Sequence, residues 1–448
     1  MSWIIFILTA LILIWILLKS SLVSGSFLSK KFVIAAFAAK VIAGTALTLI
    51  YTFYYTERGA ADIYKFFDDA QVIASTLEEN PGVYFRFISG VDEENPELIP
   101  YRKAMHNWEP QSPEWLEFTQ TKSYNIFTSN RIITRINAIL LPYSRGNIFT
   151  HVLFFSFLIT LASVAFSRAV FLKNKPQLLP LVLLFFWPSV LLWCSAPLKD
   201  SLTLSALFFC WYRFTGIFNN KKIIFNLVSI LFWLLILLFT KYYVIPALLA
   251  AMLIYTVHYF SSAGNKMRNG IITSLGLVLV VFLIDFALVN HPVSSILNNK
   301  REEALKAAIF GEARQMAFVN LASSGTVGML QEAPISVFRA IFHPLVPEKD
   351  QPVILWPSLL ENVALLLLCS ACLFRLVRRK NPSQQSIVFL VFVVSLAFII
   401  GYTTPVTGGL VRYKTAFIPF LIIACASALP QLKGEIAFKA ERFCFNRS

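Results

Sequence analysis

Charged residues are scarce in this chain. Only 14% of its 448 residues are Asp, Glu, Lys or Arg, whereas a soluble domain carries about 25%. No long polar linker or low-complexity tract divides the sequence. The 6 cysteines include no pair within one loop and no metal-ligand spacing within a polar segment, so neither a disulfide framework nor a zinc module is the basis of the fold. These absences exclude an ordinary soluble enzyme and a disulfide-rich secreted domain.

Long apolar runs fill the sequence instead. Apolar residues make up 57% of the chain and the mean hydropathy is +0.67, a composition typical of a polytopic membrane protein. A membrane-spanning helix needs about 20 mostly apolar residues. That criterion predicts about 11 spans, at 3–18, 32–54, 148–172, 177–195, 201–218, 223–240, 244–260, 270–290, 352–374, 386–402 and 415–430. We therefore expect an all-α polytopic bundle that forms a single membrane domain over residues 1–448.

Basic residues set the predicted topology. The net charge is +15, and the short segments on one side of the predicted spans are all basic, which places that side in the cytoplasm. The N-terminus then lies outside and the tail 431–448 is cytoplasmic. The first apolar run lacks a basic start and a small-residue cleavage site, so we expect a retained span. Because the lysines and arginines flank spans, the charge predicts contact with membrane lipids and no nucleic-acid partner.

This topology places every unusual polar segment on the outer face. The largest are the loops 55–147 and 291–351. In "ADIYKFFDDAQVIASTLEEN" the apolar residues recur at helical spacing, which predicts an amphipathic helix lying on the membrane surface. Similar patterns predict further surface helices in "SNRIITRINAILLPYS" and "NNKREEALKAAIFGEARQMAFVNL".

Two acidic residues of the first predicted surface helix are candidate catalytic groups. Asp62 and Asp69 are seven residues apart and share a helix face. In one interpretation Asp62 caps the helix and the other acids are solvated. In the other, one carboxylate is a general base at the lipid–water boundary, where partial desolvation makes it a stronger base. The sequence leaves both interpretations open.

Basic side chains on the same face are candidate phosphate ligands. Arg131 and Arg135, four residues apart, form either a fork for a phosphate or a contact with lipid headgroups. The short tip Lys199-Asp200 interrupts an apolar hairpin. Asp200 either caps the following helix or orients Lys199 toward a lipid phosphate.

Near the end of the chain, Pro405 and two glycines precede Arg412 and Lys414 in "TTPVTGGLVRYKTAFIPF". These two basic residues either snorkel to the interface or hold an anion in the turn. Two further charges, Lys40 and Glu361, lie within predicted spans, where charges face the bundle interior or a wet cavity. We consider a Lys40–Glu361 pair as a hypothesis.

Three of these stretches together, "ADIYKFFDDA", "FWPSVLLWCSAPLKDSL" and "GLVRYKTAFIPFL", resemble bacterial multi-spanning envelope proteins placed near the GT-C glycosyltransferases and the O-antigen polymerases. The resemblance covers three short islands. It implies a GT-C-like bundle in the bacterial inner (cytoplasmic) membrane that takes a sugar from a polyprenyl-phosphate or polyprenyl-diphosphate donor on the outer face.

The resemblance also implies roles for single residues. Asp62 matches the carboxylate that activates the acceptor, with Asp68 and Asp69 as rivals. Lys199, Arg412 and Lys414 match the basic set that holds the lipid phosphate. Two features depart from the family pattern: the large loop follows the second predicted span instead of the first, and no Asp-x-Asp or Glu-x-Asp pair occurs near Asp62.

The function expected from the sequence is a transferase acting on lipid-linked sugars, in the synthesis of an envelope polysaccharide or glycolipid. Its partners would be a polyprenyl-linked sugar donor and a glycan or lipid acceptor. No cofactor is predicted, and the sequence does not specify whether a divalent metal takes part, since none is indicated. The alternatives are an O-antigen-type polymerase or ligase, a transporter or flippase for lipid-linked glycans, and a non-catalytic assembly subunit. The sequence does not specify the sugar, the carrier or the acceptor.

Overall fold

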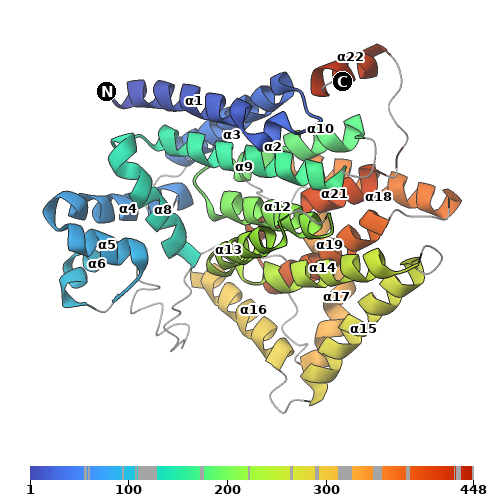
Figure 1. Cartoon of the computed structure of the whole chain (residues 1–448). Helices are drawn as coiled ribbons and strands as arrows, with labels where there is room; N and C mark the ends of the chain where they lie inside the picture. Colours follow the sequence, from blue (N-terminus) through green and yellow to red (C-terminus); the bar gives the residue numbers. More distant parts are fainter. Residues whose placement is uncertain are drawn as a thin grey trace. The chain divides into compact units, whose positions relative to one another are not determined.

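The computed structural model is built from helices (Figure 1). It describes residues 1–54, 58, 61–92, 95–105, 108, 129–171, 176–219, 222–262, 266–287, 292–310, 325–346, 356–379, 384–427, 429 and 435–445. Within these ranges there is no β-strand, and one isolated bridge joins Leu28 to Phe445. The predicted all-α fold class is confirmed for this part of the chain.

The helices overlap every predicted span. They are α1 (Ser2–Lys19), α2 (Ser21–Ser24), α3 (Lys30–Tyr54), α4 (Asp62–Glu79), α5 (Pro81–Ser89), η2 (Pro96–Leu98), α6 (Ile99–Ala104), α8 (Ser129–Ser144), α9 (Ile148–Val170), α10 (Leu178–Phe186), α11 (Pro188–Trp193), α12 (Lys199–Ile217), α13 (Ile223–Lys241), α14 (Val244–Phe260), α15 (Lys266–Ala287), α16 (Pro292–Phe310), α17 (Gly325–Phe342), α18 (Trp356–Arg379), α19 (Gln384–Thr403), α20 (Thr407–Tyr413), η5 (Lys414–Ala416), α21 (Ile418–Ala426) and α22 (Glu435–Cys444).

Six of these helices are long and apolar enough to cross a membrane, namely α1, α3, α9, α13, α18 and α19. A seventh candidate combines α20 and η5 with α21, and it is bent by 61°. The helix α14 is apolar but shorter. By length and composition the chain is therefore a multi-pass membrane protein, while the count of about 11 spans stays a prediction.

Two predicted spans are not continuous helices. The run 177–195 divides into α10 and α11 at Trp187, which has the extended backbone (ψ 125°) that a following proline favours. Pro188 then opens α11, where its missing N–H costs nothing. In the run 415–430, Pro419 opens α21 after the bend. Proline thus interrupts both runs, although apolar composition alone predicted single spans.

The chain folds into two compact units. Unit 1 comprises residues 1–174, 190–242 and 438–448, and unit 2 comprises residues 175–189 and 243–437. Each unit therefore draws on segments that are far apart in the sequence. Lys40 belongs to unit 1 and Glu361 to unit 2. Both side chains are buried, as expected, but their pairing stays a prediction.

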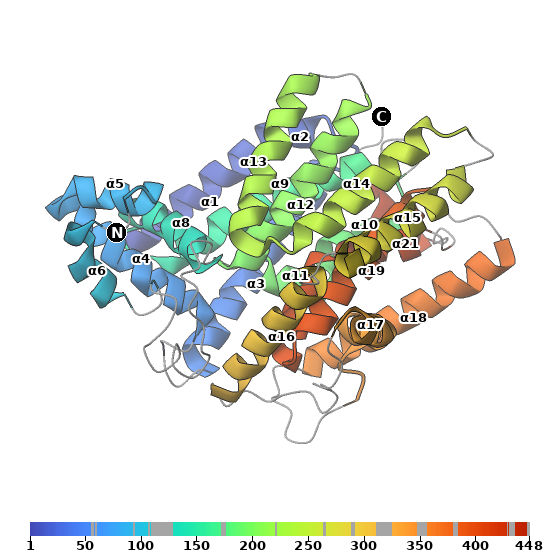
Figure 2. The ribbon, with the colours of Figure 1, turned by 90° about the horizontal axis from the view of Figure 1, so that it is seen from below.

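In unit 1, α12 packs against both α9 and α13 (Figure 2). The helices α4, α5, α6 and α8 gather at one end of the unit (Figure 1). A shared apolar core joins α3, α4 and α8 to the turn before α12 through residues such as Tyr51, Phe66, Ile133 and Leu198. This core fixes α4 beside the start of α12.

The helix predicted over "ADIYKFFDDAQVIASTLEEN" is present as α4, but its apolar stripe does not lie on lipid. Ile63, Phe66, Phe67, Ala70 and Ile73 are each at most 3% exposed within the unit 1 core. The expectation of a surface helix with its apolar face on the membrane is therefore wrong for α4. An amphipathic stripe shows that one face is dry, and here protein side chains cover that face.

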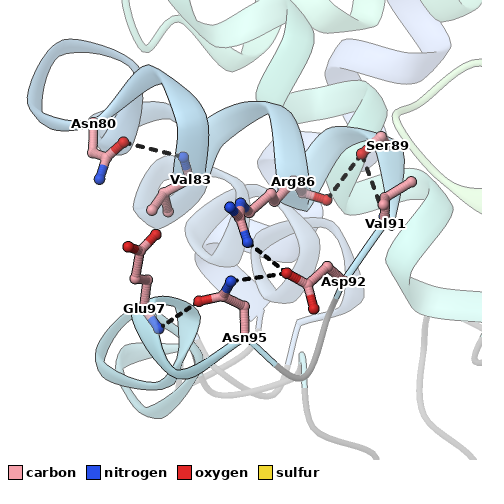
Figure 3. A network of polar contacts seen from close by, with 8 residues as sticks. All are labelled: Asn80, Val83, Arg86, Ser89, Val91, Asp92, Asn95 and Glu97. Carbon is pink, nitrogen blue, oxygen red and sulfur yellow. Dashed lines mark hydrogen bonds and ion pairs between the residues drawn. The ribbon is translucent and has the colours of Figure 1, made fainter.

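After α4, an exposed polar network shapes the chain between α5 and α6 (Figure 3). Asn80 accepts a hydrogen bond from the backbone N–H of Val83 at 3.3 Å and caps α5. Arg86 forms an ion pair with Asp92 at 2.5 Å. Asp92 also accepts a hydrogen bond from Asn95 at 2.8 Å. These contacts hold the reversal of the chain after α5.

In unit 2, α19 lies at the centre and contacts α14, α16, α17 and α21. Its closest neighbour is α17, because a Cβ added at Gly401 would lie 1.9 Å from the Ser336 carbonyl oxygen. Only glycine permits this approach of two helix backbones.

At the start of α16, Asp285 accepts hydrogen bonds from the backbone N–H groups of Val293 and Ser294, at 2.8 and 3.1 Å.

A fully buried polar chain joins α8 to α9. Asn137 donates its amide N–H to the Ile133 carbonyl at 3.0 Å, so its Oδ1 accepts from His151 Nδ1 at 2.7 Å. The neutral ring then presents Nε2 as an acceptor for the Ser144 hydroxyl at 2.9 Å. The Phe67 ring from α4 packs against the His151 ring in a T-shaped contact, with 5.1 Å between the ring centroids.

Replacing His151 with alanine should lower the free energy of unfolding by about 2–4 kcal/mol, because Asn137 and Ser144 lose a buried partner and a cavity opens. Thermal unfolding of the purified protein in detergent measures the change. Ile139→Ala on α8 is the control, since Ile139 is 52% exposed and its truncation should have little effect. Equal effects of the two substitutions would show that the polar chain contributes nothing.

Candidate functional site

The turn that precedes Lys199 is held from two sides within unit 1. Ser156 of α9 donates its hydroxyl to the Ser195 carbonyl at 3.1 Å. From α3, a Cβ added at Gly44 would lie 2.4 Å from the same oxygen, so this approach requires glycine. Ser201 donates its hydroxyl back to the Ala196 carbonyl at 2.6 Å. The turn therefore presents Lys199 from a fixed backbone.

The helix α12 begins at Lys199, and its N-cap residue is Leu198. The expectation that Asp200 caps this helix is therefore wrong. Asp200 lies in the first turn, where its negative charge still interacts favourably with the helix dipole.

The ion pair of Asp200 is made with Lys241, at the end of α13, at 2.5 Å. The two side chains are only 1% and 7% exposed. This pair ties the start of α12 to the end of α13. It gives Asp200 a structural task beyond the predicted orientation of Lys199.

Lys199 reaches the acid-bearing face of α4. Its ammonium nitrogen lies 5.6 Å from the centroid of the Phe66 ring, within the range of a cation–π interaction. Phe66 is four residues after Asp62 and three before Asp69, so the three share one side of α4. The sequence islands around Asp62 and Lys199 are thus neighbours in unit 1.

The three candidate acids have different surroundings. Asp68 receives two hydrogen bonds of 2.7 Å from the Arg58 guanidinium. Asp69 is buried, with 2% exposure. The Asp62 carboxylate is 34% exposed and lies 3.8 Å from Lys65. Of these acids, Asp62 combines solvent access with a position on the side of α4 that meets Lys199.

Arg131 and Arg135 do project together, as predicted, but toward an aromatic ring. Their guanidinium carbons lie 5.1 and 5.4 Å from the centroid of Trp108. Arg135 also donates a hydrogen bond to the Phe87 carbonyl at 2.7 Å. Trp108 is 2% exposed, so this arrangement stabilises the packing of α5 against α8. A phosphate role for the two arginines stays a prediction.

The remaining candidates, Arg412 and Lys414, belong to unit 2. Lys414 is fully buried and donates a hydrogen bond to Asn362 Oδ1. Arg412 lies in the last turn of α20 and is half-buried. Because these residues lie in a different unit from Lys199, their predicted cooperation with it stays a prediction.

A buried carboxylate accepts hydrogen bonds at the break that follows α10. Glu361 of α18 accepts hydrogen bonds from the Ser189 backbone N–H at 3.1 Å and from the Ser189 hydroxyl at 2.5 Å. The first N–H groups of a helix have no partner within it, and water is scarce in an apolar unit. Lys414 lies close enough for its charge to interact with Glu361.

Sequence reasoning missed the role of Lys241 and the contact with Phe66. In the sequence, Lys241 lies in the short link between the predicted spans 223–240 and 244–260. A lysine and an aspartate at facing ends of neighbouring spans are the signal that could have suggested the pair, because neither is stable alone in an apolar bundle.

The described residues contain no group of three or more His, Cys, Asp or Glu side chains placed to hold a metal ion. Comparison with models of known protein families finds no match. Comparisons with curated proteins and with solved structures also find no match. The role of the candidate site is therefore inferred from its geometry alone.

The buried pair Asp200–Lys241 and the exposed pair Arg86–Asp92 have the same length, 2.5 Å, and differ in burial. Lys241→Met should lower the free energy of unfolding by about 3–5 kcal/mol, because Asp200 is left charged in an apolar setting. Arg86→Met should cost less than about 1 kcal/mol. Adding Asp200→Asn to Lys241→Met should recover part of the loss. Thermal unfolding in detergent compares the variants, and equal costs for the two single substitutions would contradict the assignment.

Proposed function

We propose that the protein is a glycosyltransferase that moves a sugar from a polyprenyl-phosphate or polyprenyl-diphosphate donor to a glycan or lipid acceptor. The observation that carries this proposal is the position of Lys199 on the acid-bearing side of α4, within 5.6 Å of Phe66. A cation and a carboxylate near one another are what the reaction needs, since it releases a phosphate and removes a proton from a hydroxyl.

In this reaction the acceptor hydroxyl oxygen forms a bond to the anomeric carbon while the bond from that carbon to the phosphate oxygen breaks. Asp62 takes the hydroxyl proton as general base, with Asp69 and Asp68 as rivals. The electron pair leaves with the phosphate, whose growing negative charge Lys199 stabilises. Asp200 and Lys241 keep the start of α12 in place. The substrate supplies the sugar and the leaving group.

The architecture that we propose has about 11 spans in a GT-C-like bundle, with the N-terminus outside and the C-terminus in the cytoplasm of a bacterium. The loops 55–147 and 291–351 then lie on the outer face of the inner membrane. Helices at every predicted span support the count. In this topology Arg412 and Lys414 lie on the same face of the membrane as Lys199. We propose that these two residues, and also Arg131 and Arg135, bind the lipid phosphate.

A transporter for lipid-linked glycans is the second candidate, and one observation favours it. Two helix interruptions lie within unit 2, at Trp187 and at the 61° bend before α21. The buried charges Glu361 and Lys414 lie beside these interruptions. Broken helices around buried charges are typical of transporter binding sites. An assembly subunit and a polymerase or ligase remain further alternatives.

Turnover by the purified protein in nanodiscs tests the proposal. A panel of polyprenyl-phosphate and polyprenyl-diphosphate sugars is supplied with candidate acceptors, and release of the lipid phosphate is followed. Asp62→Asn should lower the rate about 10²–10⁴-fold, and Lys199→Ala about 10²–10³-fold. Asp92→Asn and Lys103→Ala, two exposed positions of unit 1, are the matched controls and should retain the wild-type rate.

Transport is measured in parallel by movement of the same lipids across proteoliposomes. Movement of the lipid without phosphate release would favour the transporter and contradict the transferase. Absence of both, from folded protein that binds the lipids, would favour an assembly subunit.

A further inference from the structure

Two arginines and two aromatic rings meet at the end of α12 that lies opposite Lys199. Arg213 comes fourteen residues after Lys199 on this helix, which is a distance of about 21 Å. Its guanidinium carbon lies 5.3 Å from the centroid of the Tyr212 ring and 4.6 Å from that of Phe225, at the start of α13. Arg168 of α9 approaches the same tyrosine, at 5.8 Å. Within unit 1, two cations therefore share one aromatic ring.

The helices around these two arginines carry almost no negative charge. The segments 1–56 and 118–284, which include α1, α2, α3, α9, α12 and α13, contain a single acidic residue, Asp200. That residue lies at the other end of α12 and is paired with Lys241 at 2.5 Å. Within the described part of the chain, neither Arg168 nor Arg213 forms an ion pair. The charge of this cluster therefore favours an anion from outside unit 1.

The hydrogen-bond donors of the two arginines are used only in part. Arg168 donates through one nitrogen, Nη1, to the carbonyl oxygens of Ser21 and Leu22, each at 3.1 Å. The Arg213 side chain forms no hydrogen bond to any described residue, and its Nε is buried. Both arginines are half-buried, and stacking on a ring leaves the planar donor edge of a guanidinium available. Arg213 can thus donate to an oxygen anion at the surface.

An apolar stripe begins beside these cations and continues along α13. Ile224, Val228, Leu231 and Leu235 follow one another at spacings of three and four residues and are between 44% and 78% exposed. The helix is one of those long and apolar enough to cross a membrane, and an exposed apolar stripe on such a helix contacts acyl chains. A molecule with both a phosphate and acyl chains therefore matches this surface, whereas a free anion matches the cations alone.

We propose that Arg168 and Arg213, together with the start of α13, form a binding site for an anionic phospholipid. The phosphate oxygens accept hydrogen bonds from the Arg213 guanidinium, and the charge of Arg168 adds to the attraction. The acyl chains lie along the exposed stripe of α13. In the topology proposed above, this lipid belongs to the cytoplasmic leaflet. The site lies at the opposite end of α12 from Lys199, so it does not depend on the proposed transfer reaction.

Native mass spectrometry of the full-length protein in detergent tests the site. Phosphatidylglycerol and phosphatidylcholine with the same acyl chains are added separately, and the bound fraction of each lipid is measured over a concentration series. The wild-type protein should bind phosphatidylglycerol more tightly. Arg213→Gln should weaken that binding about fivefold, because one cation near a membrane surface contributes about this factor. Binding of phosphatidylcholine should not change.

Arg145→Gln is the matched control. Arg145 is exposed and comes just before α9, whereas Arg168 lies in the last turn of that helix. The same loss of charge then takes place at the other end of α9, and phosphatidylglycerol binding should be unchanged. If Arg213→Gln does not fold, Lys222→Glu replaces it. Lys222 is exposed and directly precedes α13, so a carboxylate there should repel the lipid phosphate and remove the preference for phosphatidylglycerol.

Weaker binding of phosphatidylglycerol to Arg213→Gln or to Lys222→Glu, with unchanged binding to Arg145→Gln, supports the site. Equal binding of the two lipids by the wild-type protein would overturn the proposal. Equal losses in Arg213→Gln and Arg145→Gln would also overturn it, because the attraction would then come from the general charge of the protein. So would displacement of the lipid by potassium phosphate but not by potassium chloride at equal ionic strength, since the cations would then recognise a free phosphate.

Discussion

The stability of a buried charge in an apolar bundle is the constraint on which this structure depends. Charged side chains are few in this chain, and those inside it must meet a partner because water is scarce there. Asp200 and Lys241 meet at 2.5 Å between the start of α12 and the end of α13. That contact fixes the first turn of α12, and through it the position at which Lys199 approaches α4.

The same constraint explains the interrupted helices of unit 2. A proline breaks the run after α10, and the break frees a backbone N–H at Ser189. Glu361 accepts a hydrogen bond from this group, so the break is stable without solvent. Lys414 brings a positive charge near the carboxylate. Buried charge and irregular backbone thus stabilise one another, which is also why such places are suited to ligands.

Two described segments outside the predicted spans, α4 and α8, pack against protein. The apolar face of α4 joins the core that includes Tyr51 and Leu198, and Trp108 packs with Arg131 and Arg135. A helix held by such a core keeps its carboxylates at fixed positions relative to α12. A helix that floated on lipid headgroups would not provide a fixed geometry for catalysis.

The sequence by itself determined the all-α membrane class, the places of the apolar helices and the amphipathic nature of α4, because composition and helical periodicity depend only on neighbouring residues. It also singled out Asp62, Lys199 and Glu361 as charges that needed explanation. Only the tertiary structure decided what each charge meets. The partners Asp200 and Lys241 are 41 residues apart, and Glu361 and Ser189 are 172 apart. Periodicity carries no information over such separations. For the same reason the sequence predicted that lipid covers the apolar stripe of α4. The stripe specifies only that one helix face is shielded from water, and the packing of the whole unit determines whether lipid or protein covers that face.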